Sequence, residues 1–157
     1  MILTIDSFSG PWWFLSNFSP HGFEINGIWF PTVEHWYQAN KTCVGDTKSF
    51  MEIVNAPTPG KAKRLGQKVK LRPDWEERKV DVMLEGVKEK FQQNRELIVM
   101  LSATREKFLV EGNHWHDNIW GDCSCEKCKH IIGKNLLGNV LMHVRDLIQI
   151  GILKGEM

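Results

Sequence analysis

The sequence of 157 residues lacks most features that would place it in a specialised class of protein. Its longest purely aliphatic run, Leu97–Leu101, is far shorter than the roughly 18 residues of a membrane-spanning helix. No basic flank and long apolar stretch open the chain, so we expect no signal peptide and a cytoplasmic protein. Twenty basic and 19 acidic residues nearly cancel, and overall charge therefore does not indicate a nucleic-acid binder.

Three common catalytic motifs are also missing. The sequence has no GxxxxGK[ST] phosphate loop, no GxGxxG dinucleotide fingerprint and no GxSxG nucleophile turn. Nucleotide hydrolysis, Rossmann redox chemistry and α/β-hydrolase chemistry therefore lose their usual markers. Internal repeats and linkers are absent as well, and the length suits one domain, so a single domain over residues 1–157 is expected.

Tyrosine is scarce, whereas tryptophan is abundant. One tyrosine accompanies seven tryptophans and eight phenylalanines. A tryptophan ring can fill a core or stack on a base or a sugar, so composition leaves both roles open. The other proportions, 42% hydrophobic and 25% charged residues, are typical of a globular protein and argue against disorder, collagen and coiled coil.

Local patterns predict a helix-rich α+β fold with a small β-hairpin and several helices. Asn26-Gly27 between apolar flanks indicates a type I′ turn in a hairpin over residues 22–30. Capping residues and apolar periodicity predict the remaining elements. Three helices are expected first: one over 34–41 capped by Thr32, one from Asp46 to Val54, and one over 59–69 capped by Thr58. Two more follow, one from Asp74, with Glu77 as the capping partner, to Phe91, and one that begins at Asn94. A strand over 108–112 and a final helix over 137–148, which Gly151 ends, complete the prediction.

The cysteines are few, and three of the four stand together in C-S-C-E-K-C-K-H, residues 123–130. Three thiolates and an imidazole form a soft ligand set suited to zinc. Their spacing departs from the usual paired C-x₂₋₄-C design, so a surface loop with reduced thiols is favoured and no metal is assigned. The candidate ligands are Cys123, Cys125, Cys128 and His130, with His114 and His116 as further candidates.

The predicted helix over 34–41 has one face that combines a carboxylate with an amine. Glu34, Gln38 and Lys41 are spaced i, i+4 and i+7, so their side chains share that face and can line one wall of a pocket. A solvated helix face is the alternative. The H-W-Y sequence within the helix favours the pocket, because large aromatic groups are unusual on an exposed helix.

Two loop segments contain further candidate binding residues. Asn17 in FLSNFSP can donate and accept hydrogen bonds, as base or ribose recognition requires, although it also suits a plain turn. In the sequence H-D-N-I-W-G, Asp117 and Trp120 stand on irregular backbone, where functional residues concentrate. The alternatives are that Asp117 caps a turn and that Trp120 fills the core. Gly121 would allow the backbone to approach a ligand closely.

A basic stretch without any acidic residue runs from Ile53 to Pro73. Within it, Lys61, Arg64 and Lys68 share one helical face. Such a face can receive phosphate groups, and a solvated face is the more common explanation.

Six motifs in order resemble those of the NADAR family of YbiA-like proteins. The resemblance extends from about Phe14 to Leu147. Each motif alone is weak, but their order is specific. They are FLSNFSP, F-x-x-x-G-x-x-F-P-T-V-E-H-W-Y-Q-A-x-K, R-P-D-W, K-F-Q-Q-N, D-N-x-W-G and N-x-L-G-x-x-L-M-x-x-R.

The resemblance implies an N-glycosidase that acts on a ribosyl bond to a nitrogenous base. Family members are associated with ribosylamino intermediates of the riboflavin pathway and with removal of ADP-ribose from guanine in nucleic acid. The expected partner is therefore a small-molecule nucleotide or an ADP-ribosylated nucleic acid as substrate. No cofactor, membrane or obligate protein partner is expected.

Matching the motifs position by position assigns roles to individual residues. Glu34, Asp117 and Trp120 would form the catalytic group, and Lys41 would contact or react with the ribose C1. The Cys-rich segment departs from the glycine-rich form of this loop in the family. The substrate-binding residues implied are Asn17, Phe18, Trp75, Gly121 and Asn135.

Two alternatives to an enzyme remain open at this point. One is a binding module that holds ADP-ribose or a related nucleotide without turnover. The other is a small zinc-containing domain that binds nucleic acid through the basic helix. Of the tryptophans outside the motifs, Trp12, Trp13 and Trp29 are expected in the core, and Trp36 and Trp115 are unassigned.

Overall fold

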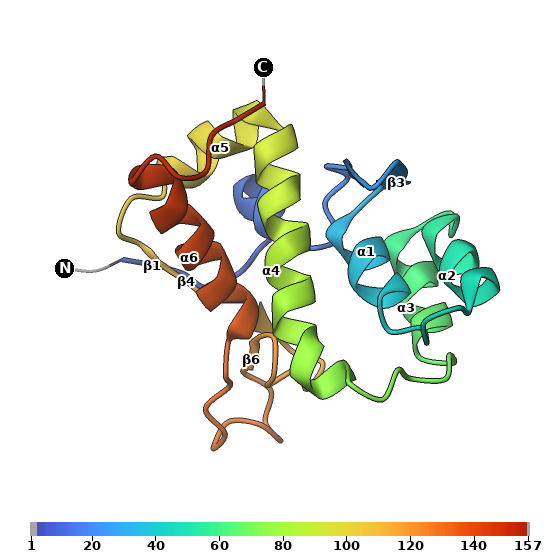
Figure 1. The fold of residues 1–157 in the computed structure, drawn as a ribbon. Helices are drawn as coiled ribbons and strands as arrows, with labels where there is room; N and C mark the ends of the chain where they lie inside the picture. Colours follow the sequence, from blue (N-terminus) through green and yellow to red (C-terminus); the bar gives the residue numbers. More distant parts are fainter. Residues whose placement is uncertain (1–2, 157) are drawn as a thin grey trace. The chain divides into compact units, whose positions relative to one another are not determined.

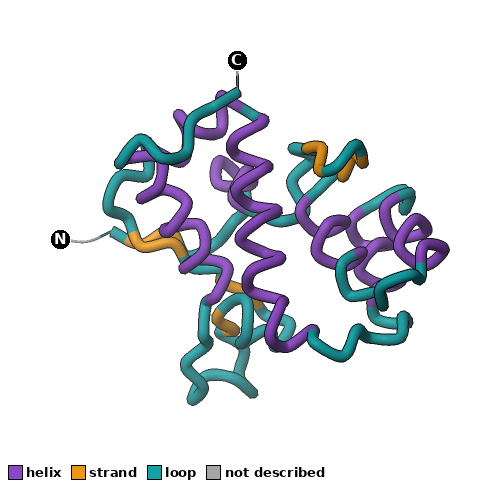
Figure 2. The backbone as a smooth tube through the Cα atoms, in the orientation of Figure 1, coloured by secondary structure: helices purple, strands orange, loops and turns teal. Residues whose placement is uncertain are grey.

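The structure is a computed structural model that describes residues 3–156 (Figures 1 and 2). Within this range, helices dominate and the strands form three two-stranded sheets, which confirms the predicted helix-rich α+β class. The contacts divide the chain into two compact units. Unit 1 comprises the described parts of Met1–Ser16 and Arg95–Met157, and unit 2 comprises Asn17–Asn94.

Unit 2 consists of a hairpin followed by four helices. Helix α1 packs against the other three helices of the unit (Figure 1). The elements are β2 (Phe23–Ile25), β3 (Ile28–Phe30), α1 (Val33–Ala39), α2 (Thr47–Val54), α3 (Pro59–Gly66) and α4 (Trp75–Gln93).

The hairpin has the predicted turn. Strands β2 and β3 pair in antiparallel fashion with Ile25 opposite Ile28. Asn26 has φ 52° and Gly27 has φ 79°, the two left-handed conformations that a type I′ turn requires. The alternation of the strand then places Phe30 in the core and Trp29 on the outside.

All four residues predicted to cap helices of unit 2 stand at the N-cap, and three of them make the side-chain hydrogen bond. Thr32, Asp46 and Thr58 each accept a hydrogen bond from the backbone N–H three residues on. Asp74 makes no such bond to α4, because both carboxylate oxygens accept from the Arg72 guanidinium, at 2.6 and 3.1 Å.

Aromatic rings form the core of unit 2. Phe30 stacks on Phe23 at 6.0 Å and meets Trp36 edge-on at 5.0 Å between ring centroids. The Trp36 indole N–H donates to the Val82 carbonyl at 2.7 Å, which fixes α1 to α4. The unassigned Trp36 is therefore a core residue whose polar group is satisfied.

Unit 1 combines two segments that are far apart in the sequence. The elements that it contains are β1 (Thr4–Ile5), η1 (Gly10–Leu15), α5 (Arg95–Ser102), β4 (Phe108–Leu109), β5 (Gly112–Asn113), β6 (Asp122–Cys123) and α6 (Leu136–Gln149). Strand β1 pairs in parallel with β4, Thr4 opposite Phe108, and α6 packs on β4 and α5 (Figure 1).

The last helix, α6, agrees closely with its prediction. Leu137, Val140 and Val144 are buried along one stripe. Gly151 follows the helix with φ 76°, and its N–H donates to the Ile148 carbonyl. The N–H of the next residue donates to the Leu147 carbonyl, which completes a Schellman motif. Gly151 therefore ends the helix as expected.

The expected core positions of three tryptophans need correction. Trp13 and Trp29, expected in the core, are 44% and 58% exposed, and Trp12 is half-buried beneath the Lys107 ammonium. Trp75 is buried, at 4% exposed, and its role in facing a substrate stays a prediction. The Trp29 ring lies over Gly22, where a side chain would collide with it.

Helix α3 is shorter than predicted. It ends at Gly66, and Gln67 caps it, whereas the sequence indicated Val69. Among the described residues, no helix is long and apolar enough to cross a membrane.

Candidate active site

Helix α1 positions the first group of candidate residues in unit 2. Glu34 is 7% exposed, and its carboxylate Oε1 accepts a hydrogen bond of 2.7 Å from Gln38 Nε2 one turn later. The Glu34 backbone N–H donates to the Asn17 carbonyl at 3.1 Å. The FLSNFSP and V-E-H-W-Y-Q motifs are thus joined at the first turn of the helix.

Gln38 holds the carboxylate in place and is itself tightly packed. Its side chain fills the space above Gly66 of α3, where an added Cβ would overlap the amide oxygen. Within residues 3–156, that buried oxygen has no hydrogen-bond partner. A buried amide oxygen without a partner is costly.

Lys41 follows the last turn of α1 and is half-buried. Burial lowers the pKa of its ammonium below the ordinary lysine value, while the negative charge of Glu34 raises that pKa and the positive charge of Lys63 lowers it. The Lys41 Nζ lies 5.2 Å from the centre of the Tyr37 ring. At a given pH, a larger fraction of Lys41 is therefore in the neutral amine form than of an exposed lysine.

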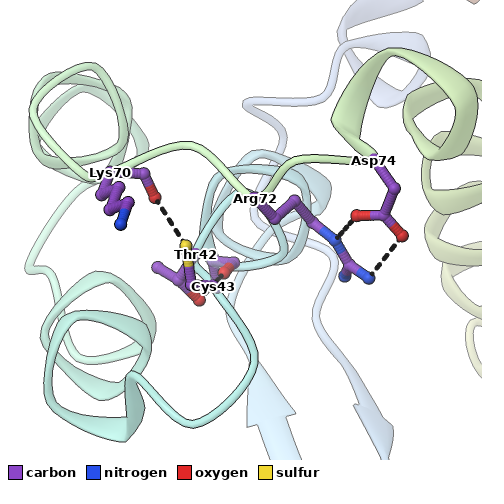
Figure 3. A network of polar contacts seen from close by, with 6 residues as sticks. Thr42, Cys43, Lys70, Arg72 and Asp74 are labelled. Carbon is purple, nitrogen blue, oxygen red and sulfur yellow. Dashed lines mark hydrogen bonds and ion pairs between the residues drawn. The ribbon is translucent and has the colours of Figure 1, made fainter.

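The segment before α4 is bound to the residues that follow α1 through backbone contacts. The Arg72 N–H donates to the Lys41 carbonyl at 2.9 Å, and Thr42 and Leu71 form an isolated antiparallel bridge. Figure 3 shows the Arg72–Asp74 ion pair next to this bridge, with the Cys43 thiol donating to the Lys70 carbonyl at 3.6 Å.

An aromatic pair continues the wall from Lys41. The Tyr37 and Trp75 rings are 5.1 Å apart and tilted by 60°, and both are buried. The observed role of Trp75 is therefore packing against α1, and its predicted stacking on a base is untested. The Asn17 amide points to the Met83 sulfur at 3.4 Å, and Phe18 is half-buried.

The second group of candidates lies in unit 1, on a segment that we call the cysteine loop, residues 113–135. Asp117 Oδ1 accepts from the Ile119 N–H at 3.0 Å and from the Trp120 N–H at 2.9 Å. One carboxylate oxygen therefore caps the turn that carries Trp120, as the structural alternative predicted. Trp120 itself is half-buried and does not fill a core.

Gly121 is required by the fold of the cysteine loop. A Cβ at Gly121 would collide with the Glu111 carbonyl, and the adjacent Asp122 N–H donates to that same carbonyl at 3.0 Å. The backbone that approaches Gly121 closely is thus that of Glu111, next to the pairing of β5 with β6. A contact with a ligand is not needed to explain this glycine.

Asn135 has a structural function at the start of α6. Its Oδ1 accepts from the Glu111 N–H at 3.0 Å and its Nδ2 donates to the Leu109 carbonyl at 2.8 Å. The residue has φ 50° and is 7% exposed. Both ends of the amide therefore bind backbone, and substrate binding by Asn135 is untested.

The thiols of the cysteine loop converge on a histidine. The donor atoms of one imidazole and three cysteines lie within 4.8 Å of one another. The imidazole is that of His116, one of the two further candidates, and not that of His130, which the sequence placed with the three cysteines. The four residues are His116, Cys123, Cys125 and Cys128.

The structure brings Glu34, Gln38 and Lys41 of unit 2 together and adds Tyr37 and Lys63, to which the prediction gave no role. Glu34 accepts a hydrogen bond from Gln38. Lys41 lies over the Tyr37 ring, and the charge of Lys63 lowers its pKa. The i, i+4 spacing pointed to Gln38, whereas nothing local indicates Lys63, which belongs to another helix. Asp117, Trp120, Gly121 and Asn135 belong to unit 1.

Comparison with known proteins places the chain in a family. A model described as the NADAR domain matches residues 6–149, which include most of both units. An N-glycosidase of Nostoc punctiforme is 37% identical over 142 residues, with 88% of this chain and 87% of that protein covered. A chloroplastic riboflavin biosynthesis protein of Zea mays, PYRR, is 38% identical over 85% of this chain but only 23% of its own length.

A solved structure agrees with these matches. The NMR structure of the Escherichia coli protein YbiA has a TM-score of 0.81 and 34% sequence identity, and the match covers 100% of this chain and 92% of that one. The relatives named N-glycosidase agree with the enzyme class that the motifs predict. The chain belongs to the NADAR family.

Proposed function

We propose that this NADAR-family N-glycosidase hydrolyses the bond between a ribosyl C1 and the nitrogen of a nucleobase-like group. The observation that carries the proposal is the α1 wall of unit 2, which we define as Glu34, Gln38 and Lys41. It combines a buried, oriented carboxylate with a lysine whose pKa is lowered by burial.

Glu34 is suited to the central step. Cleavage of a ribosyl–nitrogen bond develops positive charge on the sugar ring, and a carboxylate held in a fixed position stabilises that charge. The hydrogen bond from Gln38 fixes Glu34 Oε1 before the substrate arrives. A carboxylate that is already oriented needs no reorganisation as the charge develops.

Lys41 supplies a second function on the same wall. Its lowered pKa increases the fraction of neutral amine, which is the nucleophilic form. The neutral amine can form a bond to C1 while the bond from C1 to the base nitrogen breaks, and the base leaves with the proton that the amine loses. Opening of the sugar ring then gives a Schiff base between Lys41 and C1. Hydrolysis of that Schiff base returns the free amine and the free sugar, so the lysine is regenerated.

Asp117 and Trp120 are proposed to take part in the same reaction because they match the D-N-x-W-G motif. The turn capped by Asp117 Oδ1 leaves its second carboxylate oxygen outside the two bonds described above. That oxygen can position the attacking water, with the half-buried Trp120 ring stacking on the leaving base.

The substrate is proposed to carry phosphate. Lys61 and Arg64 on α3 are exposed, and Lys63 lies on the same helix near enough to influence Lys41. Two substrate types fit: guanine ADP-ribosylated in nucleic acid, and a ribosylaminopyrimidine phosphate of riboflavin biosynthesis. Both join a phosphorylated ribose to a planar base through nitrogen.

One experiment tests the reaction and separates the two substrates. The purified chain is incubated separately with guanine-ADP-ribosylated DNA and with a ribosylaminopyrimidine phosphate, and chromatography follows free base, free sugar phosphate and ADP-ribose. We expect release from one of them that depends on the amount of enzyme.

Binding without release would favour the alternative, a non-catalytic module for ADP-ribose or a related nucleotide. Calorimetric titration with ADP-ribose distinguishes that outcome from a lack of any interaction. Absence of release from both substrates would reject the proposed activity.

A further inference from the structure

We propose that the cysteine loop of unit 1 holds one structural zinc ion. The proposal does not depend on the proposed reaction, because it rests on a cluster of side chains outside the α1 wall. The four ligands are His116, Cys123, Cys125 and Cys128.

The donor atoms already have the separations of a small coordination shell. His116 Nδ1 lies 3.3 Å from the Cys125 sulfur and 3.4 Å from the Cys128 sulfur. Bond lengths of about 2.3 Å to sulfur and 2.0 Å to nitrogen imply about 3.5 Å between a nitrogen and a sulfur donor, and about 3.8 Å between two sulfurs, around a tetrahedral zinc. All four donors fall within 4.8 Å of one another, so only small shifts are needed.

Two pieces of backbone supply the ligands in pairs. Cys125 and Cys128 form a C-x₂-C turn that is closed by a hydrogen bond of 2.9 Å from the Cys128 N–H to the Cys125 carbonyl. Cys123 belongs to β6, and its sulfur accepts from the His116 N–H at 3.3 Å. The second pair is therefore His116 and Cys123, although seven positions separate them in the sequence.

The backbone conformation of His116 supports a role as a ligand. His116 has φ 70°, which is uncommon for a residue with a side chain, and this conformation accompanies an imidazole that meets the thiols. His130 is exposed and belongs to no such cluster among residues 3–156.

Ligand chemistry selects the metal and its role. Three thiolates and one imidazole are soft ligands that favour zinc over magnesium or calcium. Binding releases the three thiol protons to solvent and changes no oxidation state. Because four protein ligands complete the tetrahedron, no position remains for water, and the site is structural and not catalytic.

The cysteine loop also has a physical need for such a site. It is drawn almost entirely as loop in Figure 2, apart from the short strands β5 and β6. Four of its large apolar side chains are exposed: Trp115 is 61% exposed, Ile119 46%, Ile131 52% and Ile132 93%. Hydrophobic burial therefore contributes little here, and a metal would supply the missing constraint.

Metal content of the full chain is the first test. The chain is purified in reducing buffer, incubated with zinc, passed through a desalting column and measured by mass spectrometry. We expect one zinc per chain in the wild type, and none in the variants Cys125→Ser and His116→Ala. Matched controls, Cys43→Ser and His130→Ala, should retain one zinc per chain.

A wild type that retains no zinc would overturn the proposal, as would Cys125→Ser and His116→Ala chains that retain it. Loss of zinc from His130→Ala together with retention in His116→Ala would also overturn the ligand set.

Cobalt substitution provides evidence that needs no variant. The wild-type chain is treated with a chelator, and Co²⁺ is added. We expect an intense thiolate-to-cobalt charge-transfer band and the strong visible bands of tetrahedral Co²⁺. A weak octahedral spectrum would contradict three thiolate ligands, even if all the variants failed to fold.

Discussion

The two groups of candidate residues differ in what holds them. On the α1 wall, the helix satisfies its own backbone, so the Glu34 and Gln38 side chains bind each other. In the cysteine loop, side chains satisfy the backbone hydrogen-bonding groups, as Asp117 and Asn135 do by accepting from backbone N–H groups. A loop residue that matches a functional motif can therefore have two roles, and only a variant that keeps the structural bond separates them.

The largest expected effect belongs to the α1 wall. In Glu34→Gln, the new amide oxygen still accepts the hydrogen bond from Gln38, but the negative charge is lost. We expect turnover to fall about 10³-fold, within the range for a lost catalytic carboxylate, with an unchanged thermal midpoint. Initial rates of base release measure the effect. Glu52→Gln, at an exposed carboxylate of α2, is the matched control, and equal rates for both variants would remove Glu34 from the reaction.

The corresponding test in the cysteine loop uses a pair of variants. Asp117→Asn keeps the oxygen that accepts from Ile119 and Trp120, whereas Asp117→Ala loses it. We expect both variants to lose about 100-fold in turnover, because both lose the charge. Only Asp117→Ala should also lose stability, by about 1 kcal/mol as for a lost cap.

Rates and chemical denaturation of the two variants give the answer. Wild-type turnover in Asp117→Asn would show that Asp117 has a structural role alone. The same comparison can be extended with Trp120→Ala, which removes the ring but leaves the capped turn.

Zinc removal tests whether the loop depends on a constraint that the helix does not need. Asp117 and Trp120 lie between His116 and Cys123, so loss of the metal would release both ends of that segment. We expect chelation to lower turnover about 10-fold, because small misplacements of catalytic groups are costly. Turnover is measured before chelation, after it and after zinc is restored. Full activity in a chain shown to be free of zinc would show that turnover does not depend on the metal.

The smallest effect concerns the charge around Lys41. The neutral amine increases as the pH rises through the lysine pKa, so a step that uses it gives a rising limb of turnover with pH. Burial lowers that pKa and Lys63 lowers it further, which places the limb below the ordinary lysine range. Lys63→Met removes the second cause, raises the pKa and moves the limb to higher pH.

Complete pH profiles of turnover measure this shift. Lys48→Met, at an exposed lysine of α2, should leave the limb in place. A limb that moves to lower pH in Lys63→Met, or does not move, would show that it does not report on Lys41.

Local chemistry explains why much of the fold was predictable. The Asn26-Gly27 turn and the caps at Thr32, Asp46 and Thr58 depend on a few neighbouring residues, and all four are confirmed. Asp74 stands at the N-cap of α4, but its side chain makes no capping hydrogen bond because the nearby Arg72 side chain competes for its carboxylate. Such competition cannot be read from a capping pattern alone.

The site was predictable only in part for a related reason. The helical spacing of Glu34 and Gln38 predicted their contact, which is present. The ligand cluster is different, because His116 reaches the thiols through a left-handed backbone and a β5–β6 pairing that spacing does not reveal. The same applies to the Trp75 ring, whose burial depends on Tyr37.

The pairing of β1 with β4 has a consequence for the order of folding. Unit 2 is one continuous stretch, whereas unit 1 needs Thr4 to meet Phe108 across the whole of unit 2 in the sequence. Closing so long a loop costs entropy before any contact is gained, so contacts of this kind form late. We expect amides of unit 2 to be protected first in pulsed hydrogen exchange during refolding. During synthesis, the α1 wall would then be assembled before the cysteine loop leaves the ribosome.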